Sequence, residues 1–472
     1  MWKSNKIAQI LDANLFGSES AVFSGCTLDS RQVVEGNLFV AVQGEKVDGH
    51  NFIAQAFEAG AAVVIGEETR LGDIDLSIIP PGKALLGVKS SLKALQELAT
   101  VWCSELHPIV VGITGSSGKT TTKDMVTIVL AQKYRVHSNK ENFNNEIGLP
   151  LTILNSPHKT EIMVLEMGMR GLGQIKELCG ICKPSLGVIT NIGTTHMELL
   201  GSHENIARAK WELIDSLGEN GVAVLNSEDL LSIQLANSTA INKIFYGTTG
   251  RYVKPDVEGS NLQISGELGT TFEVCFQGNK EAVELPLPGE HNVLDALAAL
   301  SVGIHYGISL KSGAQALKDL KLSKMRLNIF EGILGSIIID DVYNANPDSM
   351  KASLNVLAQR GEQQSVAVLG EMYELGELSI SGHREVGETV AHLGIDTLVT
   401  VGEMAEGIAQ GARDAGLSEQ RIHICSNCTQ AVQEVMTILQ RKGAKTWVLI
   451  KGSRGMKMEQ ITQKLVPTKN KL

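Results

Sequence analysis

The sequence predicts an α/β protein of three domains, in which the second and third domains contain mostly parallel sheets. The chain has 472 residues, against roughly 100 to 200 residues for a typical domain. Its hydrophobic fraction of 43% and charged fraction of 20% are typical of a folded globular protein. From about residue 109 onward, short apolar runs alternate with amphipathic stretches. Because strands that alternate with helices pair in parallel sheets covered on both faces, this order indicates the α/β class.

The first 88 residues differ from the remainder and predict a smaller, mixed α/β domain. Their apolar runs are shorter, at 38–42 and 62–65, and a Pro-Pro-Gly break at 80–82 precedes a helical stretch at 90–102. Proline and glycine interrupt regular structure, so we place the first domain boundary after residue 88.

Eight further strands are predicted at the apolar runs 109–113, 162–166, 186–191, 222–226, 336–341, 365–369, 397–401 and 446–450. Between residues 246 and 288 the pattern changes to alternation interrupted by glycines, most clearly at 261–274. This change predicts antiparallel hairpins appended to the second domain. A second boundary near residue 322 then gives domains of residues 1–88, 89–322 and 323–472.

Charge and hydropathy exclude several classes of function. The 52 acidic and 42 basic residues give a formal net charge of −10, which repels the phosphate backbone of nucleic acids and anionic membrane surfaces. The amino-terminal segment has no apolar stretch of signal-peptide length, and no window approaches the ~20 apolar residues of a membrane span. We therefore expect a cytoplasmic protein with no nucleic-acid partner and no membrane span, and we expect a monomer.

Seven cysteines in a chain of this length do not form a disulfide scaffold. Two Cys-x-x-Cys pairs, Cys179 with Cys182 and Cys425 with Cys428, leave two alternatives: one four-thiolate zinc site or ordinary buried thiols. The pairs lie far apart in the sequence and neither occurs in a ribbon-like loop, which favours buried thiols.

The most specific local signal is IVVGITGSSGKTT at 109–121, which combines a buried strand, a Gly-rich turn and the start of a helix. Gly115 and Gly118 allow backbone N–H groups to approach phosphate oxygens, and the following helix presents its positive end. Lys119 would then reach the β- and γ-phosphates, and the Thr120 hydroxyl would bind Mg²⁺. The spacing is a variant, because the common motif has glycine where this chain has Ile113. The alternative is an ordinary Gly-rich turn before a helix.

Glu166 lies at the end of one other predicted strand and His196 shortly after another, where a parallel sheet places its ligands. Glu166 ends the run 162–166, and His196 follows the run 186–191 across a short turn. Both side chains are candidate metal ligands. Taken singly, a helix-capping role for Glu166 and a purely structural role for His196 are the alternatives.

Lys210 falls on the apolar stripe of a predicted helix that follows Ser202, a favourable N-cap. The buried face of this helix is predicted from Ile206, Leu213, Ile214 and Leu217. One interpretation is a lysine that extends its ammonium group out of a half-buried face. The other is a lysine in the ligand site, where an ammonium beside Mg²⁺ is repelled and must be neutral or chemically altered.

In their order along the chain, these segments resemble the Mur ligases, the ATP-dependent amide-forming enzymes that build the peptidoglycan stem peptide. The resemblance covers nearly the whole chain. It is carried by TGSSGKTT at 114–121, NFNNEIGLP at 142–150, EMG at 166–168, TNIGTTH at 190–196, IARAKWE at 206–212, GEHN at 289–292, MR at 325–326 and DDVYNANP at 340–347.

The resemblance implies a UDP-substrate domain at the amino terminus, a central phosphate-loop ATPase domain and a Rossmann-like carboxyl-terminal domain for the amino acid or dipeptide. The block at 341–347, together with Asp29-Ser30-Arg31, implies one particular reaction. In that reaction, D-alanyl-D-alanine is joined to UDP-N-acetylmuramoyl-tripeptide through an acyl phosphate. ATP and two Mg²⁺ ions take part, in the cytoplasmic synthesis of peptidoglycan precursors.

The resemblance also implies roles for individual residues. The catalytic residues are Lys119, His196 and Lys210, with Lys210 converted by CO₂ to a metal-binding carbamate. The metal ligands are Thr120, Glu166, His196 and Lys210. The ATP-binding residues are Gly115, Ser116, Ser117, Gly118, Lys119, Thr120, Thr121, Asn292, Arg326 and Asp341. The residues for the other substrates are Ser30, Arg31, Asn142, Asn145, Asn344 and Asn346.

Two other functions remain open from the sequence. A folylpolyglutamate synthetase-like ligase shares the phosphate loop and the carbamate but adds glutamate to folate. The block at 344–347 and a UDP-type amino-terminal domain argue against it. A phosphate-loop regulatory NTPase would hydrolyse ATP without a small acceptor, and it gives no reason for His196 and Lys210.

The segment KGSR at 451–454 follows a predicted buried strand. It is a candidate anion nest for a carboxylate, and a simple turn is the alternative.

Overall fold

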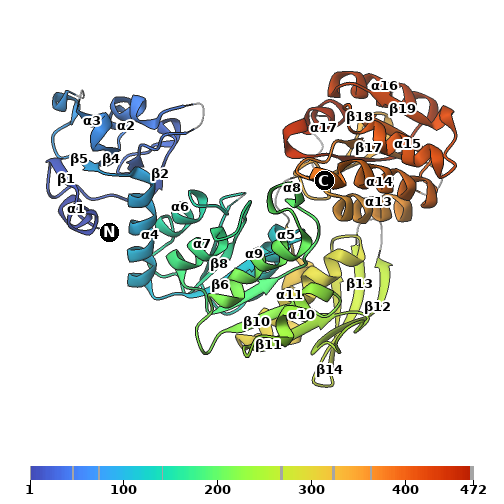
Figure 1. Ribbon diagram of the computed structural model, residues 1–472, viewed down its shortest axis with the longest axis horizontal. Coiled ribbons are helices and arrows are strands. Elements are labelled where there is room, and N and C mark those ends of the chain that lie inside the picture. The colour runs from blue at the N-terminus through green and yellow to red at the C-terminus, as the bar shows by residue number, and fades with distance from the viewer. Residues whose placement is uncertain are drawn as a thin grey trace.

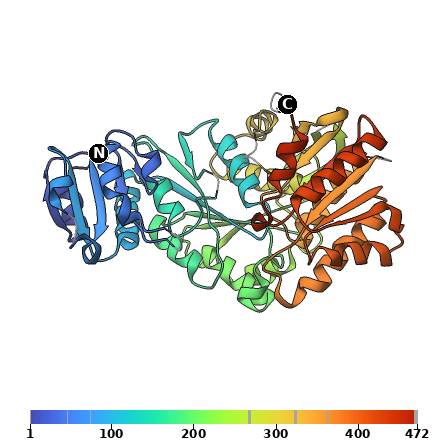
Figure 2. The same ribbon diagram turned by 90° about the horizontal axis from the view of Figure 1, so that it is seen from above.

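The computed structural model describes residues 2–44, 47–72, 75–140, 142–265, 269–321, 325–361 and 364–467. They form three α/β domains, each with its own sheet, which confirms the predicted fold class. The central domain lies between the two others (Figures 1 and 2). The predicted second boundary, between residues 322 and 323, lies outside the described residues. None of the helices in these ranges is both long and apolar enough to cross a bilayer.

The amino-terminal domain is a five-stranded sheet with short helices. Its strands lie in the order β1-β5-β4-β3-β2, with β1 antiparallel to β5 and the others parallel. The strands are Asn14–Gly17 (β1), Cys26–Thr27 (β2), Leu38–Val40 (β3), Val63–Glu67 (β4) and Ala84–Val88 (β5). The helices are Ser4–Leu11 (α1), Ile53–Glu58 (α2) and Glu68–Leu71 (α3).

Helix α4 (Ser91–Leu106) leads from this sheet into the central domain. Ser90 caps it, because the Ser90 hydroxyl accepts a hydrogen bond from the Lys93 N–H. Trp102 of α4 packs edge-to-face against Trp2, with 5.1 Å between ring centroids. One hydrophobic core continues from the amino-terminal sheet past α4 to one face of the central sheet, so these two domains are joined by apolar packing.

The central domain is built on a nine-stranded sheet in the order β14-β13-β12-β11-β10-β9-β6-β8-β7. Strands β6 to β12 pair in parallel, and β12, β13 and β14 pair antiparallel. The strands are Ile109–Thr114 (β6), Val136–Ser138 (β7), Ile162–Glu166 (β8), Leu186–Ile189 (β9), Val222–Asn226 (β10), Asn242–Gly247 (β11), Val257–Ser265 (β12), Gly269–Phe276 (β13) and Asn279–Leu285 (β14). The helices are Lys119–Leu130 (α5), Gly148–Leu154 (α6), Gln174–Cys182 (α7), Met197–Leu200 (α8), His203–Asp215 (α9), Leu230–Asn237 (α10), Glu290–His305 (α11) and Leu310–Lys318 (α12).

The carboxyl-terminal domain has a six-stranded sheet in the order β15-β16-β20-β17-β18-β19, in which β15 alone among the described strands is antiparallel to its neighbour. The strands are Asn328–Glu331 (β15), Ile337–Asp340 (β16), Ser365–Gly370 (β17), Thr397–Val401 (β18), Ile422–Cys425 (β19) and Trp447–Lys451 (β20). The helices are Pro347–Gly361 (α13), Ser379–His392 (α14), Glu406–Asp414 (α15), Cys428–Lys442 (α16) and Glu459–Leu465 (α17).

This third domain has a core of its own. Within the described ranges, its two hydrophobic clusters contain no residue from the other domains. The third domain therefore meets the central one through polar contacts rather than a shared apolar core.

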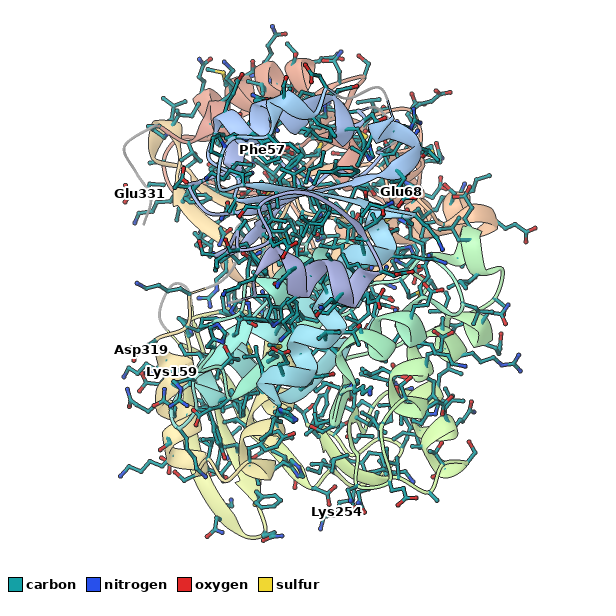
Figure 3. All side chains as sticks on the ribbon, turned by 90° about the vertical axis from the view of Figure 1, so that its left-hand side faces the viewer. Phe57, Glu68, Lys159, Lys254, Asp319 and Glu331 are labelled. Carbon is teal, nitrogen blue, oxygen red and sulfur yellow. The ribbon has the colours of Figure 1, made fainter. Side chains whose placement is uncertain are left out.

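In the first two domains, charged side chains such as Glu68, Lys159 and Lys254 point outward from the ribbon (Figure 3), whereas Phe57 is buried.

The eight strands predicted from residue 109 onward all occur, and their ends agree with the prediction to within two residues. The antiparallel hairpins predicted before residue 288 are also confirmed. After residue 109, strands β7, β11, β15 and β19 were not predicted, because exposed or half-buried side chains interrupt their apolar runs.

Candidate active site

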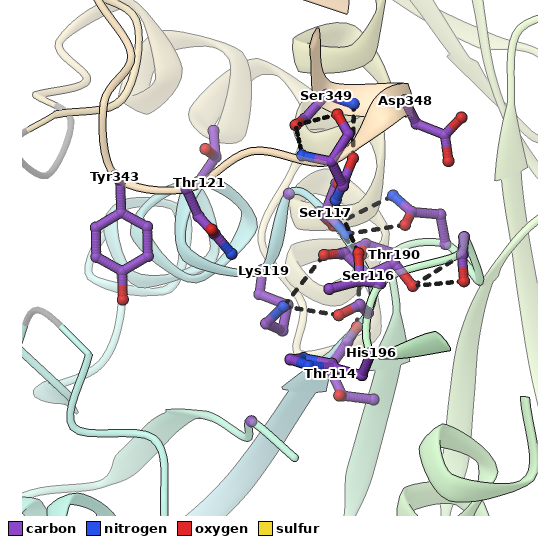
Figure 4. Close-up of a pocket in the computed structure, with 18 of the residues that line it drawn as sticks. Thr114, Ser116, Ser117, Lys119, Thr121, Thr190, His196, Tyr343, Asp348 and Ser349 are labelled. Atoms are coloured by element: carbon purple, nitrogen blue, oxygen red, sulfur yellow. Dashed lines mark hydrogen bonds between the residues drawn. The ribbon is translucent and has the colours of Figure 1, made fainter. Parts of the chain in front are cut away.

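A large cavity lies between the central and carboxyl-terminal domains, at the carboxyl ends of β6, β8 and β9. Its volume is about 1080 Å³. Ile113 of β6 lies opposite Glu166 of β8, and Thr114 lies opposite Ile189 of β9, so the three strands end together. Because β6 lies between β8 and β9, the strand order of the sheet reverses at β6. Open α/β sheets bind their ligands at such a topological switch point. Figure 4 shows side chains of both domains facing this cavity.

The phosphate loop joins β6 to α5 and is held tightly against β9. Gly118 has φ +80° and Gly115 has φ +157°, backbone that residues with a side chain rarely adopt. A Cβ at Gly115 would lie 1.8 Å from Thr190 Oγ1. The Thr190 hydroxyl donates to the Ser117 carbonyl oxygen at 2.5 Å, and Asn191 Oδ1 accepts from the Ser117 N–H at 3.0 Å. Despite its variant spacing, the loop is therefore ordered by its neighbours.

Lys119 begins α5 and its ammonium folds over the loop. It donates to the Gly115 carbonyl oxygen at 2.7 Å and to the Ser116 carbonyl oxygen at 3.4 Å. Burial lowers the pKa of Lys119, and the Glu166 carboxylate partly opposes this effect. Ser116, Ser117, Lys119 and Thr121 all line the cavity.

Glu166 is buried and held by four hydrogen bonds. Its Oε2 accepts from the Thr120 hydroxyl and its Oε1 accepts from Asn144 Nδ2, both at 2.7 Å. The Asn139 side chain accepts from the Glu166 N–H at 2.8 Å and donates to the Glu166 carbonyl oxygen at 2.9 Å. The structure thus brings two predicted metal ligands, Thr120 and Glu166, into direct contact.

Lys210 lies on α9, which Ser202 caps as expected. Its side chain is 2% exposed and lines the cavity, so the ammonium does not extend into solvent. In the described part of the chain, no hydrogen bond or ion pair reaches Lys210 Nζ. Burial and the nearby Lys119 lower the pKa of Lys210 well below its usual value, while Asp229 acts in the opposite direction.

His196 directly precedes α8, and the carboxyl-terminal domain contacts it. Its Nδ1 lies 2.5 Å from Oε2 of Glu374. Next to it, Asn346 Nδ2 donates to the Thr195 hydroxyl at 2.8 Å and to the Ser117 hydroxyl at 3.2 Å. The predicted metal-binding loop is therefore contacted from the third domain.

Asn292 and Asp295 lie on the first two turns of α11, and Asp295 lies against Gly118 of the phosphate loop. Asn292 is buried, and its Nδ2 donates to the Pro288 carbonyl oxygen at 2.7 Å. Asp295 Oδ1 accepts from the Thr122 hydroxyl at 2.9 Å, and a Cβ at Gly118 would lie 2.5 Å from the same oxygen. Burial raises the pKa of Asp295 to about 7.

Asp341 is paired with Lys451 at 2.5 Å, and its Oδ2 also accepts from the Ser353 hydroxyl at 2.7 Å. Burial acts to raise the pKa of Asp341, but Lys451 and Ser353 outweigh it and the net effect is a lowered pKa. The Arg326 guanidinium lies 4.0 Å from the centre of the Tyr343 ring. The lysine of the candidate anion nest thus has a carboxylate partner within its own domain.

The predicted substrate asparagines differ in their surroundings. Asn142 and Asn344 are exposed and line the cavity. Asn145 also lines it, but its Oδ1 accepts from the N–H of Gly148, the first residue of α6, at 2.9 Å. Asn346 Oδ1 accepts from the Ser349 N–H at 2.8 Å, so its amide group is engaged on both sides.

Ser30 and Arg31 lie in the amino-terminal domain and do not line this cavity. The Ser30 hydroxyl donates to Gln55 Oε1 at 2.9 Å. The Arg31 side chain is 81% exposed and forms an ion pair with Asp29 at 2.8 Å. A long substrate is needed to connect these two residues with the cavity.

The two Cys-x-x-Cys pairs lie in different domains, one at the end of α7 and the other between β19 and α16. All seven cysteines are free. Over the described ranges, no three or more His, Cys, Asp or Glu side chains gather into a metal-binding group. Burial raises the pKa of Cys179 to about 12, as expected for an unreactive buried thiol.

A magnesium ion fits this cavity only together with a ligand that brings oxygens of its own. Glu166 supplies a carboxylate and His196 an imidazole, and both line the cavity. Thr120 does not line it, but its hydroxyl contacts the Glu166 carboxylate. Mg²⁺ usually keeps several waters and combines one or two protein carboxylates with substrate phosphates. A carbamate on Lys210 would add a carboxylate-like group where a bare ammonium lacks a partner.

Sequence reasoning missed three residues that shape the site. Asn144 holds Glu166, Asp295 supports the phosphate loop, and Glu374 contacts His196. Two of them had a usable signal: Asp295 follows Asn292 by three residues on one helix, and Glu374 follows the carboxyl end of β17. The contact between Glu374 and His196 joins two domains, and no sequence spacing indicates it.

Comparison with known proteins gives a consistent result along the chain. Residues 22–101 match "Mur ligase family, catalytic domain", residues 113–303 match "Mur ligase middle domain", and residues 325–454 match "Mur ligase, glutamate ligase domain". A curated relative, UDP-N-acetylmuramoyl-tripeptide–D-alanyl-D-alanine ligase of Bacillus subtilis, is 40% identical over 449 residues, which cover 95% of this chain and 94% of the relative.

Solved structures agree with this match. MurF from Acinetobacter baumannii has a TM-score of 0.85 at 28% identity and covers 98% of both chains. MurF ligase from Thermotoga maritima in complex with ADP has a TM-score of 0.79 at 31% identity, covering 93% of this chain and 96% of that chain. From its amino-terminal domain to its third domain, this chain belongs to the Mur ligase family.

Proposed function

We propose that this Mur ligase uses ATP to join D-alanyl-D-alanine to UDP-N-acetylmuramoyl-tripeptide. The observation that carries the proposal is one cavity between two domains that contains the phosphate loop, Glu166, His196 and the buried Lys210. The 40% identity to a ligase of this name over almost the whole chain supports the same reaction. The product is a precursor of peptidoglycan, and the reaction takes place in the cytoplasm, where ATP is available.

ATP binds with its phosphates on the loop at 115–121 and its base beside Asn292. Lys119 and the loop N–H groups neutralise phosphate charge, while Arg326 and Asp341 approach from the third domain. Thr120, Glu166, His196 and a carbamate of Lys210 would hold two Mg²⁺ ions. These ions would supply positive charge next to the transferred phosphoryl group.

The carboxylate of the tripeptide attacks the γ-phosphate to give an acyl phosphate and ADP. The chain's own residues bind the nucleotide, orient the two reactants and stabilise the charge that develops. The neutral amine of the dipeptide then attacks the acyl carbon, and phosphate leaves. Because an acyl phosphate hydrolyses easily, the third domain must cover the cavity and exclude water.

The substrates span more than one domain in this proposal. Ser30 and Arg31 hold the uridine diphosphate, for which a guanidinium is a suitable partner. Asn142 and Asn145 border the path of the peptide, and Asn344 and Asn346 border the dipeptide. Residues 1–88, 89–322 and 323–472 act as the three domains of a monomer.

The test is ADP release measured with each combination of substrates, together with the mass of the product. We expect ATP turnover only when a UDP-N-acetylmuramoyl-tripeptide and D-alanyl-D-alanine are both present, and a product with a new amide bond. Lys119→Ala should abolish turnover, whereas Lys176→Ala, which removes an exposed lysine of the same domain, should not. Turnover with folate and glutamate would favour a folylpolyglutamate synthetase, and turnover without any acceptor would favour a regulatory NTPase.

A further inference from the structure

The carboxyl-terminal domain contacts one loop of the central domain, residues 191–198, through several hydrogen bonds. Asn346 donates to the Thr195 hydroxyl at 2.8 Å, and the Glu198 N–H donates to the Glu374 carbonyl oxygen at 3.3 Å. Between them, Glu374 Oε2 lies 2.5 Å from His196 Nδ1. These bonds join residues that are far apart in the sequence, so they exist only while the two domains are together.

The contact between Glu374 and His196 determines which nitrogen of the imidazole ring can bind a cation. An ionised carboxylate only accepts hydrogen bonds, so Nδ1 carries the proton and donates it to Glu374. Nε2 then keeps its lone pair, which is the form in which a neutral imidazole binds a metal. Carboxylates that accept from the second ring nitrogen commonly orient metal-binding histidines.

The backbone of both contacting residues, His196 and Glu374, adopts an uncommon conformation. His196 has φ +67° and Glu374 has φ +63°, which are uncommon values for residues other than glycine. Gly376, at φ +54°, allows the third domain to approach closely, because a Cβ there would lie 3.0 Å from the Cα of Glu198. Unusual backbone of this kind persists where the surrounding structure requires it.

We propose that Glu374 is a positioning residue that orients His196 from the third domain. When that domain docks, Glu374 holds the ring with Nε2 ready for the cation; when it moves away, the ring is free to turn. Cation binding and domain docking therefore favour each other, since a coupling between two equilibria acts in both directions. The inference rests on the proposed function, which places a cation at His196.

The test compares Glu374→Ala, Glu374→Gln and His196→Ala with a matched control, Glu377→Ala. Glu377 is an exposed carboxylate three residues further along the same segment. The affinity for Mn²⁺, a paramagnetic substitute for Mg²⁺, is measured by electron paramagnetic resonance on the full-length protein with the ATP analogue AMP-PNP. Hydrogen–deuterium exchange of residues 191–198 is measured first without any ligand and then with Mn²⁺ and AMP-PNP.

We expect Glu374→Ala to weaken Mn²⁺ binding about 10- to 100-fold and to speed exchange in residues 191–198 without ligand. Glu374→Gln should restore most of the affinity, because its amide oxygen can still accept from Nδ1. Glu377→Ala should behave as the wild type. Mn²⁺ with AMP-PNP should slow exchange at residues 373–378 in the wild type but not in Glu374→Ala.

Wild-type Mn²⁺ affinity in Glu374→Ala would overturn the inference, and so would a Glu374→Gln variant as weak as the alanine variant. His196→Ala separates this failure from a failure of the proposed function. If His196→Ala weakens Mn²⁺ binding and Glu374→Ala does not, the metal site stands and Glu374 has no positioning role. If neither variant weakens it, the assignment of a cation to His196 is itself wrong.

Discussion

Replacing Asp295 by asparagine should stabilise the central domain at alkaline pH and have little effect at acidic pH. Burial raises the pKa of Asp295 from 3.8 to about 7, so the folded protein holds this proton more tightly than the unfolded chain. Below pH 3.8 both states are protonated and burial of the group carries no charge penalty. As the pH rises from 3.8 to 7, the unfolded chain loses its proton first, and the free energy of unfolding falls.

The magnitude follows from the width of this pH interval. About three pH units, at about 1.4 kcal/mol each, give a loss of about 4 kcal/mol in the wild type by pH 8. About two of these units lie above pH 5, so about 3 kcal/mol of the difference between variant and wild type develops between pH 5 and pH 8. Asparagine keeps a carbonyl oxygen that can accept from the Thr122 hydroxyl.

The assay is urea unfolding followed by tryptophan fluorescence at pH 5 and pH 8. The chain has four tryptophans, and Trp447 is the one in the carboxyl-terminal domain. In a Trp447→Phe background, the remaining three tryptophans report on the core that the amino-terminal and central domains share. Glu290→Gln removes an exposed carboxylate from the same helix and serves as the control. An equal difference in stability at both pH values would refute the reasoning from burial.

Three further predictions concern the site itself. Lys210→Ala should abolish ligase activity, and added short carboxylates should restore part of it, because they replace the carbamate. ADP release measures both effects, and full activity of the variant without additives would exclude the carbamate. Gly115→Ala should weaken ADP binding about tenfold or more, equivalent to about 1.4 kcal/mol, because its Cβ would lie 1.8 Å from Thr190 Oγ1. Titration calorimetry measures this affinity, and a wild-type value in the variant would contradict the prediction. Asn144→Ala should raise the activation barrier by about 1 to 3 kcal/mol and so lower kcat, because Glu166 Oε1 loses its donor. Steady-state kinetics tests this, and an unchanged kcat would mean that Asn144 does not hold Glu166 for catalysis.

The strands of the parallel sheets could be predicted because both faces of each strand are buried. The runs at β6, β8 and β10, for example, are apolar up to their last residue and almost wholly buried. In contrast, β11 begins with Asn242 and Lys243, and its place beside β10 depends on pairing with a neighbour rather than on its own pattern. Pairing between distant segments is a tertiary property, so local sequence reasoning does not find such strands.

The polar residues of the central domain could be located because they follow strands or lie on one helix face. The phosphate loop and His196 each follow a strand, Glu166 ends one, and Lys210 lies within an apolar helical stripe. Sequence reasoning left open whether Lys210 reaches solvent, and its 2% exposure answers that question. The hydrogen-bond partners of these residues could not be predicted from the sequence, because a hydrogen bond depends on distances of a few ångströms between atoms.

Order along the chain therefore determined the α/β class, the phosphate loop and the likeness to one family, because apolar runs and short motifs are local properties. Only the tertiary structure decided which side chains meet. It closed a cavity between two domains, placed Asp295 beneath the phosphate loop and brought Glu374 to His196. The physical reason is that hydrogen bonds and burial depend on positions in space, and residues separated by a whole domain acquire those positions only when the sheets and helices pack.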